Sequence, residues 1–278
     1  MNANEAYMLS EKKFRLPKDI PLEEYPKPET YLEEAQRLTR EAQKEGLILR
    51  AMGPIALHYY FPQYIDLYRS MERLGERVFT DIDYAAYGKQ RGKFLSFFQK
   101  QGYEVERRAL MMSGGERHIY FGERIPMIDV FFDHLNYNHP IDYRNRLEIH
   151  PLCVSLSDLL LQKLQIVQIN DKDLKDAMLL FLASKISDNE GEGICWKYIT
   201  KLFSDDWGFY YTATTNLEKV KEAAKNVKVL EDNHRQIINK NIDYLLEKIE
   251  SYPKSGKWKS REKIGTKKIW YNEITDWM

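Results

Sequence analysis

The chain has 278 residues, of which 43% are hydrophobic and 13% aromatic, so it can bury a core and is not an intrinsically disordered chain. Its 42 basic and 42 acidic residues cancel, and any surface for nucleic acid must therefore be a local patch. Two cysteines are too few for a disulfide framework or a zinc cluster, and no apolar run reaches the ~20 residues of a membrane span. We expect a cytoplasmic protein with no membrane partner.

The first part of the chain predicts a mixed α/β domain that follows a surface arm. Residues 1–29 are polar and rich in proline, and we interpret them as the arm. Thr30 and Glu33 form a capping-box pair for a helix that runs to about residue 45 and ends at Gly46. Short apolar runs predict strands, and a turn is expected at 113–115. The further elements expected are strands at 47–49, 78–84, 103–107, 118–122, 127–132 and 147–152, and helices at 55–57, 64–74 and 93–100.

The pattern becomes helical from Ser155 onward. Ser155 and Asp158 form a second capping signature, and apolar residues then recur at helical spacing. We predict an α+β protein, with a small mixed β-sheet flanked by helices in residues 30–155 and a helical bundle with a basic C-terminal tail in residues 156–278. The helices expected in this second part are at 156–167, 174–185, 196–203, 217–226 and 236–251.

Three aspartates stand among β-branched and aromatic residues in the first part. Asp81 and Asp83 are two residues apart on a predicted strand, so both side chains point to one face. Asp129 lies on another predicted strand between apolar neighbours. Three converging carboxylates repel one another unless cations lie between them, and Mg²⁺ is the natural hard cation. The alternative is an exposed strand edge that carries charged residues.

Two neighbouring features bear on this interpretation. Gly53 stands at a strand-to-helix junction, where backbone N–H groups favour bound phosphate, but the following Pro54 supplies no N–H. Asp133, four residues after Asp129, is an alternative third carboxylate because both would share a strand face. Cys153 and Cys195 have no activating partner in the sequence, and we expect buried structural thiols.

The order of these residues resembles the DNA polymerase β-like nucleotidyltransferase superfamily, over about residues 45–185. The shared pattern is a glycine turn, an Asp-x-Asp strand preceded by Arg and Ser/Thr, and a third acidic residue on a neighbouring strand. The segment 157–164 is similar to the lysine-bearing helix of the AbiEii-like group, which includes toxin components of toxin–antitoxin systems. The segment 172–176 resembles that group's basic-Asp-x-x-Asp segment.

The resemblance implies a reaction and a set of residues. The reaction is metal-dependent transfer of a nucleoside monophosphate from an NTP to an acceptor hydroxyl, with release of pyrophosphate. Asp81 and Asp83 would bind two Mg²⁺ ions, and Asp129 would complete one of the two sites. Asp173 and Asp176 would orient Lys163 or the base, although a charge pair at a helix N-terminus is an equal alternative. The implied nucleotide-binding residues are Gly53, Arg77, Thr80, Lys163, Lys172, Asp173 and Asp176.

The sequence leaves alternatives for the acceptor molecule and for whether the protein is a catalyst. The family usually has Gly-Ser or Gly-Gly where this chain has Gly53-Pro54, which leaves a non-catalytic nucleotide-binding protein on the same fold as an alternative. The acceptor could be a tRNA 3′ end or another RNA, a protein side chain, or a small alcohol such as an aminoglycoside. The basic tail at 254–271, with its interleaved aromatic residues, favours RNA, unless those aromatic residues only pack on the helical part. The toxin resemblance also implies an antitoxin-like protein partner.

Overall fold

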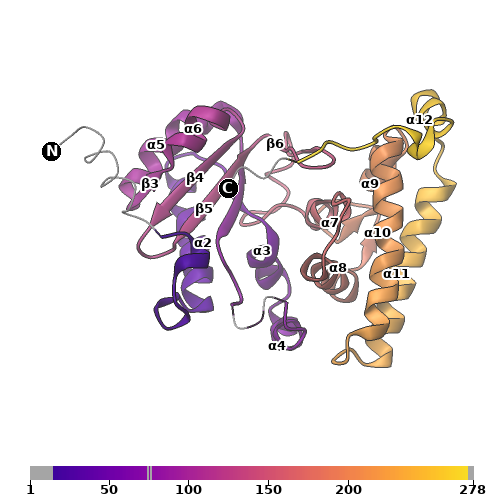
Figure 1. Ribbon diagram of the computed structural model, residues 1–278, viewed down its shortest axis with the longest axis horizontal. Helices are drawn as coiled ribbons and strands as arrows, with labels where there is room; N and C mark the ends of the chain where they lie inside the picture. The colour runs from indigo at the N-terminus through magenta and orange to yellow at the C-terminus, as the bar shows by residue number, and fades with distance from the viewer. Residues whose placement is uncertain (1–14, 74, 76, 275–278) are drawn as a thin grey trace. The chain divides into compact units, whose positions relative to one another are not determined.

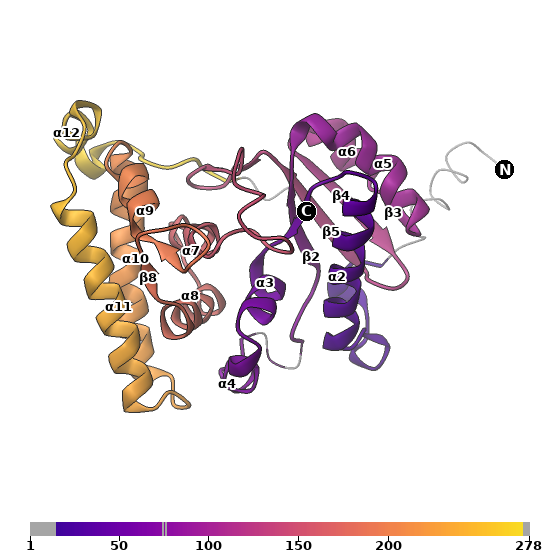
Figure 2. The ribbon, with the colours of Figure 1, turned by 180° about the vertical axis from the view of Figure 1, so that it is seen from behind.

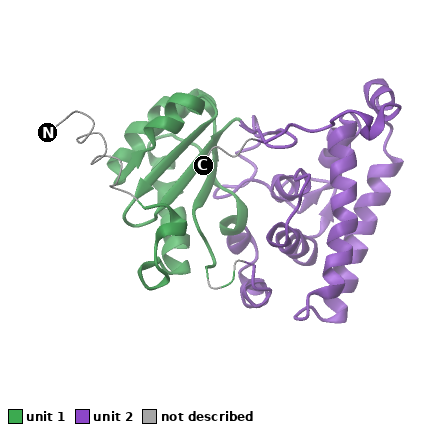
Figure 3. Ribbon diagram, viewed as in Figure 1, with its two compact units in different colours: residues 1–56, 74–133 green, residues 57–73, 134–278 purple. Residues whose placement is uncertain are grey.

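The computed structural model describes residues 15–73, 75 and 77–274 (Figure 1). The chain forms two compact units, which we call unit 1, residues 1–56 and 74–133, and unit 2, residues 57–73 and 134–278 (Figure 3). The segment 57–73 therefore belongs with unit 2, whereas the sequence placed it in the domain at 30–155. The predicted α+β class is confirmed, since unit 1 contains a mixed β-sheet and unit 2 is mostly helical.

Unit 1 is built on a five-stranded sheet with the order β1-β2-β5-β4-β3. Strands β2 and β5 are parallel, and the other neighbouring pairs are antiparallel. The parallel pair lies at the centre and places residue 83 beside residue 129. The strands are β1 (Leu49–Ala51), β2 (Ile82–Ala86), β3 (Tyr103–Val105), β4 (Arg117–Gly122) and β5 (Met127–Phe132).

Helices α2 (Pro28–Lys44) and α5 (Arg91–Lys100) cover one face of this sheet (Figure 2). The hydroxyl of Tyr84 on β2 donates to the Ala35 carbonyl of α2 at 2.9 Å, and the ring of Phe98 on α5 stacks on Tyr120 at 4.1 Å. Side chains alternate along a strand, so the neighbours of Tyr84 point to the opposite face. Helix α6 (Arg107–Ser113) packs on part of that opposite face through Ala109.

Unit 2 consists mainly of helices that pack through their apolar faces. Helix α8 contacts α7, α10 and α11, and Leu160, Leu180 and Ile242 are fully buried there. The Ser155 hydroxyl accepts the Asp158 N–H at 3.1 Å, which confirms the predicted cap of α7. Cys153 and Cys195 are both buried, as expected. The main helices are α7 (Leu156–Leu164), α8 (Asp171–Ala183), α9 (Trp196–Phe203), α10 (Trp207–Asn226), α11 (Asp232–Ser251) and α12 (Gly256–Glu262).

The remaining elements are short. Helix α3 (Gly53–Tyr60) contains the boundary between the units, and α4 (Ile65–Ser70) follows in unit 2. Strands pair as β6 (His134–Leu135) with β7 (Ile141–Asp142), and β8 (Ile186–Ser187) with β9 (Ile194–Cys195). Of the described helices, none combines the length and the apolar content that crossing a bilayer requires. Single-turn 3₁₀ helices lie at Pro17–Asp19, Leu22–Glu24, Pro62–Tyr64, Gly88–Gln90 and Gly265–Lys267.

Three sequence predictions were wrong, each for a local reason. The first long helix begins at Pro28, which is favoured at the start of a helix, and not after a Thr30 cap. Residues 113–115 do not close a hairpin, because α6 fills that connection and the Glu106 carboxylate caps it at the Ala109 N–H. Residues 147–152 form turns and bends instead of a strand.

Other helix and strand boundaries differ from those predicted from the sequence. Strand β2 begins at Ile82 and ends at Ala86, so residues 78–81 lead into the strand rather than belonging to it. Helix α10 begins at Trp207, ten residues before the predicted start, where the Asp206 carboxylate accepts the Phe209 N–H. The first fourteen residues of the predicted arm lie outside the described residues, and residues 15–29 contain two single 3₁₀ turns and the start of α2.

Candidate metal centre

The three predicted aspartates meet on the face of the sheet opposite α2 and α5. Asp83 and Asp129 are register partners on the parallel strands β2 and β5, and Asp81 immediately precedes β2. One carboxylate oxygen from each lies within 4.8 Å of the others. Ile82 and Tyr84, which flank Asp83, are fully buried on the other face, so the alternation that the sequence predicted is present. An exposed strand edge does not describe this site, because β2 and β5 are central strands.

The backbone around the carboxylates is held by specific contacts. Gly53 has φ +56°, and a Cβ at this position would lie 3.5 Å from Oδ2 of Asp83, so the glycine turn closely approaches that carboxylate. Thr80 donates its hydroxyl to Oδ1 of Asp81 at 3.0 Å. The hydroxyls of Tyr25 and Tyr31 both donate to the Thr80 carbonyl, at 3.2 and 3.3 Å. Gly53 and Thr80 therefore lie at the carboxylate group, as the sequence predicted.

Arg117 binds the most buried of the three aspartates. Its Nε and Nη2 donate to Oδ1 and Oδ2 of Asp129 at 3.0 and 2.7 Å. Burial raises the pKa of Asp129, and the guanidinium beside it opposes that rise. The pair is bidentate and mostly shielded from water, which is the geometry that fixes a carboxylate most firmly.

A second charged cluster, which lies wholly in unit 2, contains Lys163. Its Nζ donates to Asp173 at 2.9 Å and contacts Asp176 at 2.8 Å, so the three residues that the resemblance implied as neighbours lie together. Arg73 donates to Asp176 from Nε at 2.6 Å and from Nη2 at 3.0 Å, and the Tyr68 hydroxyl also donates to Asp176. Two cations and two carboxylates are thus paired within one buried group. The predicted contact of Lys163 with a triphosphate stays a prediction.

In this second cluster, burial and ion pairing shift the pKa values of Asp176 and Lys163 in opposite directions. Burial alone would raise the pKa of Asp176, but Lys163 and Arg73 outweigh it and lower that pKa to about 2. Burial alone would lower the pKa of Lys163, but Asp176 and Asp173 outweigh it and raise that pKa. The ionised forms of Lys163 and Asp176 are therefore stabilised by their charged neighbours in the cluster.

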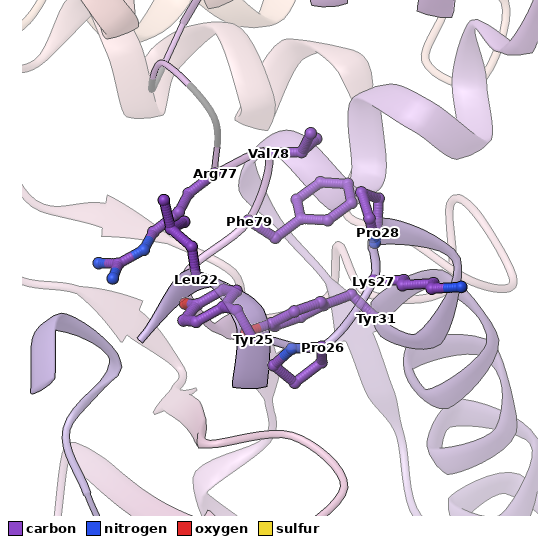
Figure 4. Close-up of a pocket in the computed structure, with 9 residues that line it drawn as sticks. All are labelled: Leu22, Tyr25, Pro26, Lys27, Pro28, Tyr31, Arg77, Val78 and Phe79. Atoms are coloured by element: carbon purple, nitrogen blue, oxygen red, sulfur yellow. The ribbon is translucent and has the colours of Figure 1, made fainter. Parts of the chain in front are cut away.

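Arg77 lies with the N-terminal segment of unit 1. Its Nη2 donates to the Ile20 carbonyl at 2.8 Å, and its guanidinium lies 4.8 Å from the Tyr25 ring centroid. Arg77 and Tyr25 line a pocket of about 190 Å³, whose walls include Tyr31 and Phe79 (Figure 4). Because Tyr25 and Tyr31 also bond the Thr80 carbonyl, this pocket adjoins the segment that carries Asp81.

The other sequence candidates have different surroundings. Asp133 does not belong to the carboxylate group, and its Oδ1 accepts the Gly88 N–H at 2.9 Å. Lys172 is exposed on α8. In the tail, Trp258 and Trp270 pack on Tyr210 and Tyr211 of α10. The exposed basic residues of the tail are Lys257, Lys259, Lys263, Lys267 and Lys268.

The donor set of the carboxylate group fits a hard divalent cation. All three residues offer carboxylate oxygen, and their separation allows one ion to contact more than one of them. Arg117 occupies one lone pair on each oxygen of Asp129, and an ionised carboxylate has about four, so coordination by Asp129 is not blocked. Asp81, Asp83 and Asp129 would hold the ion.

Three charged or polar residues of these clusters were missed from sequence. Arg117 faces Asp129 because β4 pairs with β5, and a hairpin register between the two predicted strands would have indicated it. Tyr68 and Arg73 reach Asp176 from more than a hundred positions earlier in the chain. No local pattern in the sequence links those segments.

Comparisons with family models, with curated proteins and with solved structures found no significant match to this chain.

Proposed function

We propose that unit 1 carries a metal-dependent nucleotidyltransferase site, which moves a nucleoside monophosphate from an NTP to an acceptor hydroxyl with release of pyrophosphate. The observation that carries the proposal is the convergence of three carboxylates, those of Asp83 and Asp129 on the central strand pair and that of Asp81 just before β2. The glycine turn beside Asp83 supports it, since a helix N-terminus at that point favours a phosphate group.

Each residue would have a role that follows from its position in the site. Asp81 and Asp83 would hold the divalent ions, with Mg²⁺ as the expected species and two as the expected number. When bound, such ions supply the positive charge that offsets the charge growing on the transferred phosphate and on pyrophosphate. Asp129 would complete the coordination on the side of the acceptor hydroxyl and accept its proton. Thr80 orients Asp81 through its 3.0 Å hydrogen bond.

RNA is the acceptor class that we favour. The tail of unit 2 exposes Lys259, Lys263, Lys267 and Lys268, and such a cluster suits contact with phosphates. Its tryptophans Trp258 and Trp270 pack on α10, so the RNA contact would be mainly electrostatic. A tRNA 3′ end is one such acceptor, and an antitoxin-like protein is the partner that the family resemblance adds.

A non-catalytic nucleotide-binding protein is the second candidate. Pro54 at the second position of α3 supplies neither an N–H nor a hydroxyl to a phosphate. Proline at this position therefore weakens phosphate binding and leaves the three carboxylates unchanged.

Incubation with each labelled NTP, Mg²⁺ and a total-RNA pool tests the proposal. We expect label in RNA with the wild-type chain and a loss of at least about a hundredfold with Asp81→Asn, because a metal ligand is removed. A variant in which the tail lysines are neutral should weaken transfer to RNA more than NTP binding. Measurable binding of Mg²⁺ and NTP without label on RNA, protein or an aminoglycoside would favour the non-catalytic candidate.

A further inference from the structure

The pocket of unit 1 that contains Arg77 has an aromatic wall. The ring centroids of Tyr25 and Tyr31 lie 6.3 Å apart with an interplanar angle of 25°, and those of Tyr31 and Phe79 lie 5.6 Å apart. The guanidinium of Arg77 lies 4.8 Å from the Tyr25 centroid, so a planar cation extends this group of rings. Figure 4 shows Arg77 and Lys27 on opposite sides of the rings.

The pocket opens to solvent at its rim. Leu22 is 48% exposed there, and Tyr25 is half-buried. Tyr31 and Phe79 are buried and lie deeper in the pocket. An aromatic wall that ends at an exposed apolar side chain differs from a closed core, because a flat apolar group from solution can enter it.

Basic groups accompany the aromatic wall. Among the described residues that line the pocket, the charged ones are Arg77 and Lys27. The Ile20 carbonyl accepts one N–H of Arg77 at 2.8 Å, which fixes a side chain that has five such donors. Lys27 is exposed. Aromatic rings and a guanidinium plane stack with nucleobases, and basic side chains bind the phosphates attached to them.

The size and the position of the pocket restrict the ligand. Its volume of about 190 Å³ is below the ~300–1,000 Å³ of sites that enclose a whole small molecule, so it suits one ring system of a larger ligand. The hydroxyls of Tyr25 and Tyr31 donate to the carbonyl of Thr80, and Asp81 is the next residue. A base in this pocket would therefore lie beside the candidate metal centre.

We propose that this pocket binds one nucleobase of the acceptor RNA, close to the hydroxyl that reacts, with Arg77 and Lys27 at the adjacent phosphates. The proposal rests on the proposed function above and assigns a contact of the RNA with unit 1. Stacking accepts every base, so the pocket sets the position of the strand and not its sequence. Arg77 then binds the acceptor rather than the NTP.

Photocrosslinking locates the base without any measurement of activity. Single-stranded RNA that contains 4-thiouridine is irradiated with the full chain in EDTA and without NTP, and the modified peptides are identified by mass spectrometry. We expect crosslinks in peptides that contain Tyr25 or residues 77–79. Crosslinks confined to other peptides, or none, would overturn the proposal. Crosslinking of 4-thio-UTP in place of the RNA at these residues would assign the pocket to the NTP and would also overturn it.

Two variants of Tyr25 separate its ring from its hydroxyl. Binding of a fluorescent oligouridylate is measured by anisotropy, again in EDTA. Tyr25→Leu removes the ring and should weaken binding about tenfold or more. Tyr25→Phe removes only the hydrogen bond to Thr80 and should change binding by less than about twofold, because stacking needs the ring alone. Equal losses in the two variants would contradict a base that stacks in the pocket.

Two exposed lysines cover the case in which Tyr25→Leu does not fold. Lys27→Gln should weaken binding about threefold and lower its dependence on salt, since one phosphate contact is lost. Lys18→Gln is the matched control, because Lys18 is exposed in the same N-terminal segment and does not line the pocket. Equal effects of the two would overturn the proposal.

The labelled-NTP experiment separates this proposal from the proposed function. Crosslinks in the pocket without transfer of label to RNA would contradict the nucleotidyltransferase and support a base pocket. Transfer of label with crosslinks confined to other peptides would overturn the base pocket alone.

Discussion

The two charged clusters of this protein differ in the groups that they bring together. In unit 2, the cations Lys163 and Arg73 pair with Asp173 and Asp176, and the cluster is neutral. In unit 1, three carboxylates converge so that one oxygen of each lies within 4.8 Å of the others, and Arg117 binds Asp129. The acidic and basic groups of the first cluster bind one another, whereas the second cluster offers three carboxylate oxygens that are close enough to share a hard cation. The comparison therefore indicates a structural role for the first and a binding role for the second.

The largest effect that this comparison predicts is on the stability of unit 2. Asp176→Asn should lower its free energy of unfolding by about 3–5 kcal/mol, because Arg73 loses the carboxylate that it binds and Lys163 keeps only one of its two. Urea unfolding followed by tryptophan fluorescence measures this, since all five tryptophans lie in the part of the chain that belongs to unit 2. Asp171→Asn is the control on the same helix, where the side chain is 72% exposed, and a change below about 1 kcal/mol is expected. Equal effects of the two variants would contradict a structural role for the cluster.

Divalent ions should stabilise unit 1 and leave unit 2 unchanged. At a Mg²⁺ concentration one hundred times the dissociation constant, the gain should be about 2.7 kcal/mol. Hydrogen exchange of peptides from β2 and β5 measures it, with peptides from α8 as the internal reference. The protection should vanish with EDTA and in Asp83→Asn. Protection that persists in that variant would show that the ions bind elsewhere.

Acid should weaken unit 2 in a defined range of pH. The folded pKa of Asp176 is about 2, below its ordinary value of 3.8. A lowered pKa in the folded state means that the carboxylate contributes stability above pH 3.8, and this contribution is lost as the pH falls toward 2. The stability difference between the wild type and Asp176→Asn should shrink by up to about 2 kcal/mol over this range. A difference that stays constant from pH 4 to 2 would contradict the ion pairing.

The smallest expected effect is a gain in stability, whereas the first prediction is a loss. In EDTA, Asp83→Asn should raise the stability of unit 1 by about 1 kcal/mol, because it removes repulsion between carboxylates within 4.8 Å. Tyrosine fluorescence or hydrogen exchange of β2 during urea unfolding measures the change. Asp19→Asn, at an exposed position of the same unit, should have no effect. A loss of stability in Asp83→Asn would mean that the contacts of this carboxylate within the chain outweigh the repulsion.

Sequence periodicity predicted the fold class and the shared face of Asp81 and Asp83, because alternation along a strand is a local property. The place of Asp129 beside them followed from the family resemblance, since the pairing of β2 with β5 is not a local property. The resemblance also placed Lys163 with Asp173 and Asp176, and the structure brings these three side chains together. Sequence periodicity missed α6, because Ser113-Gly114-Gly115 is a strong turn signal and the cap at Glu106 is a single residue. Arg117 and Arg73 were missed because their partners depend on strand register and on contacts between distant segments.

The two phenol hydroxyls that meet at the Thr80 carbonyl have a practical consequence. Asp81 stands just before β2 and outside its ladder of hydrogen bonds. The hydrogen bonds from Tyr25 and Tyr31 to the Thr80 carbonyl therefore hold its segment in place. Tyr31 belongs to α2, but Tyr25 precedes that helix. A shortened version of the protein that starts at Pro28 would preserve every strand of the sheet and still lose half of this anchor. Trimming the chain for crystallisation or binding studies should therefore stop well before Tyr25.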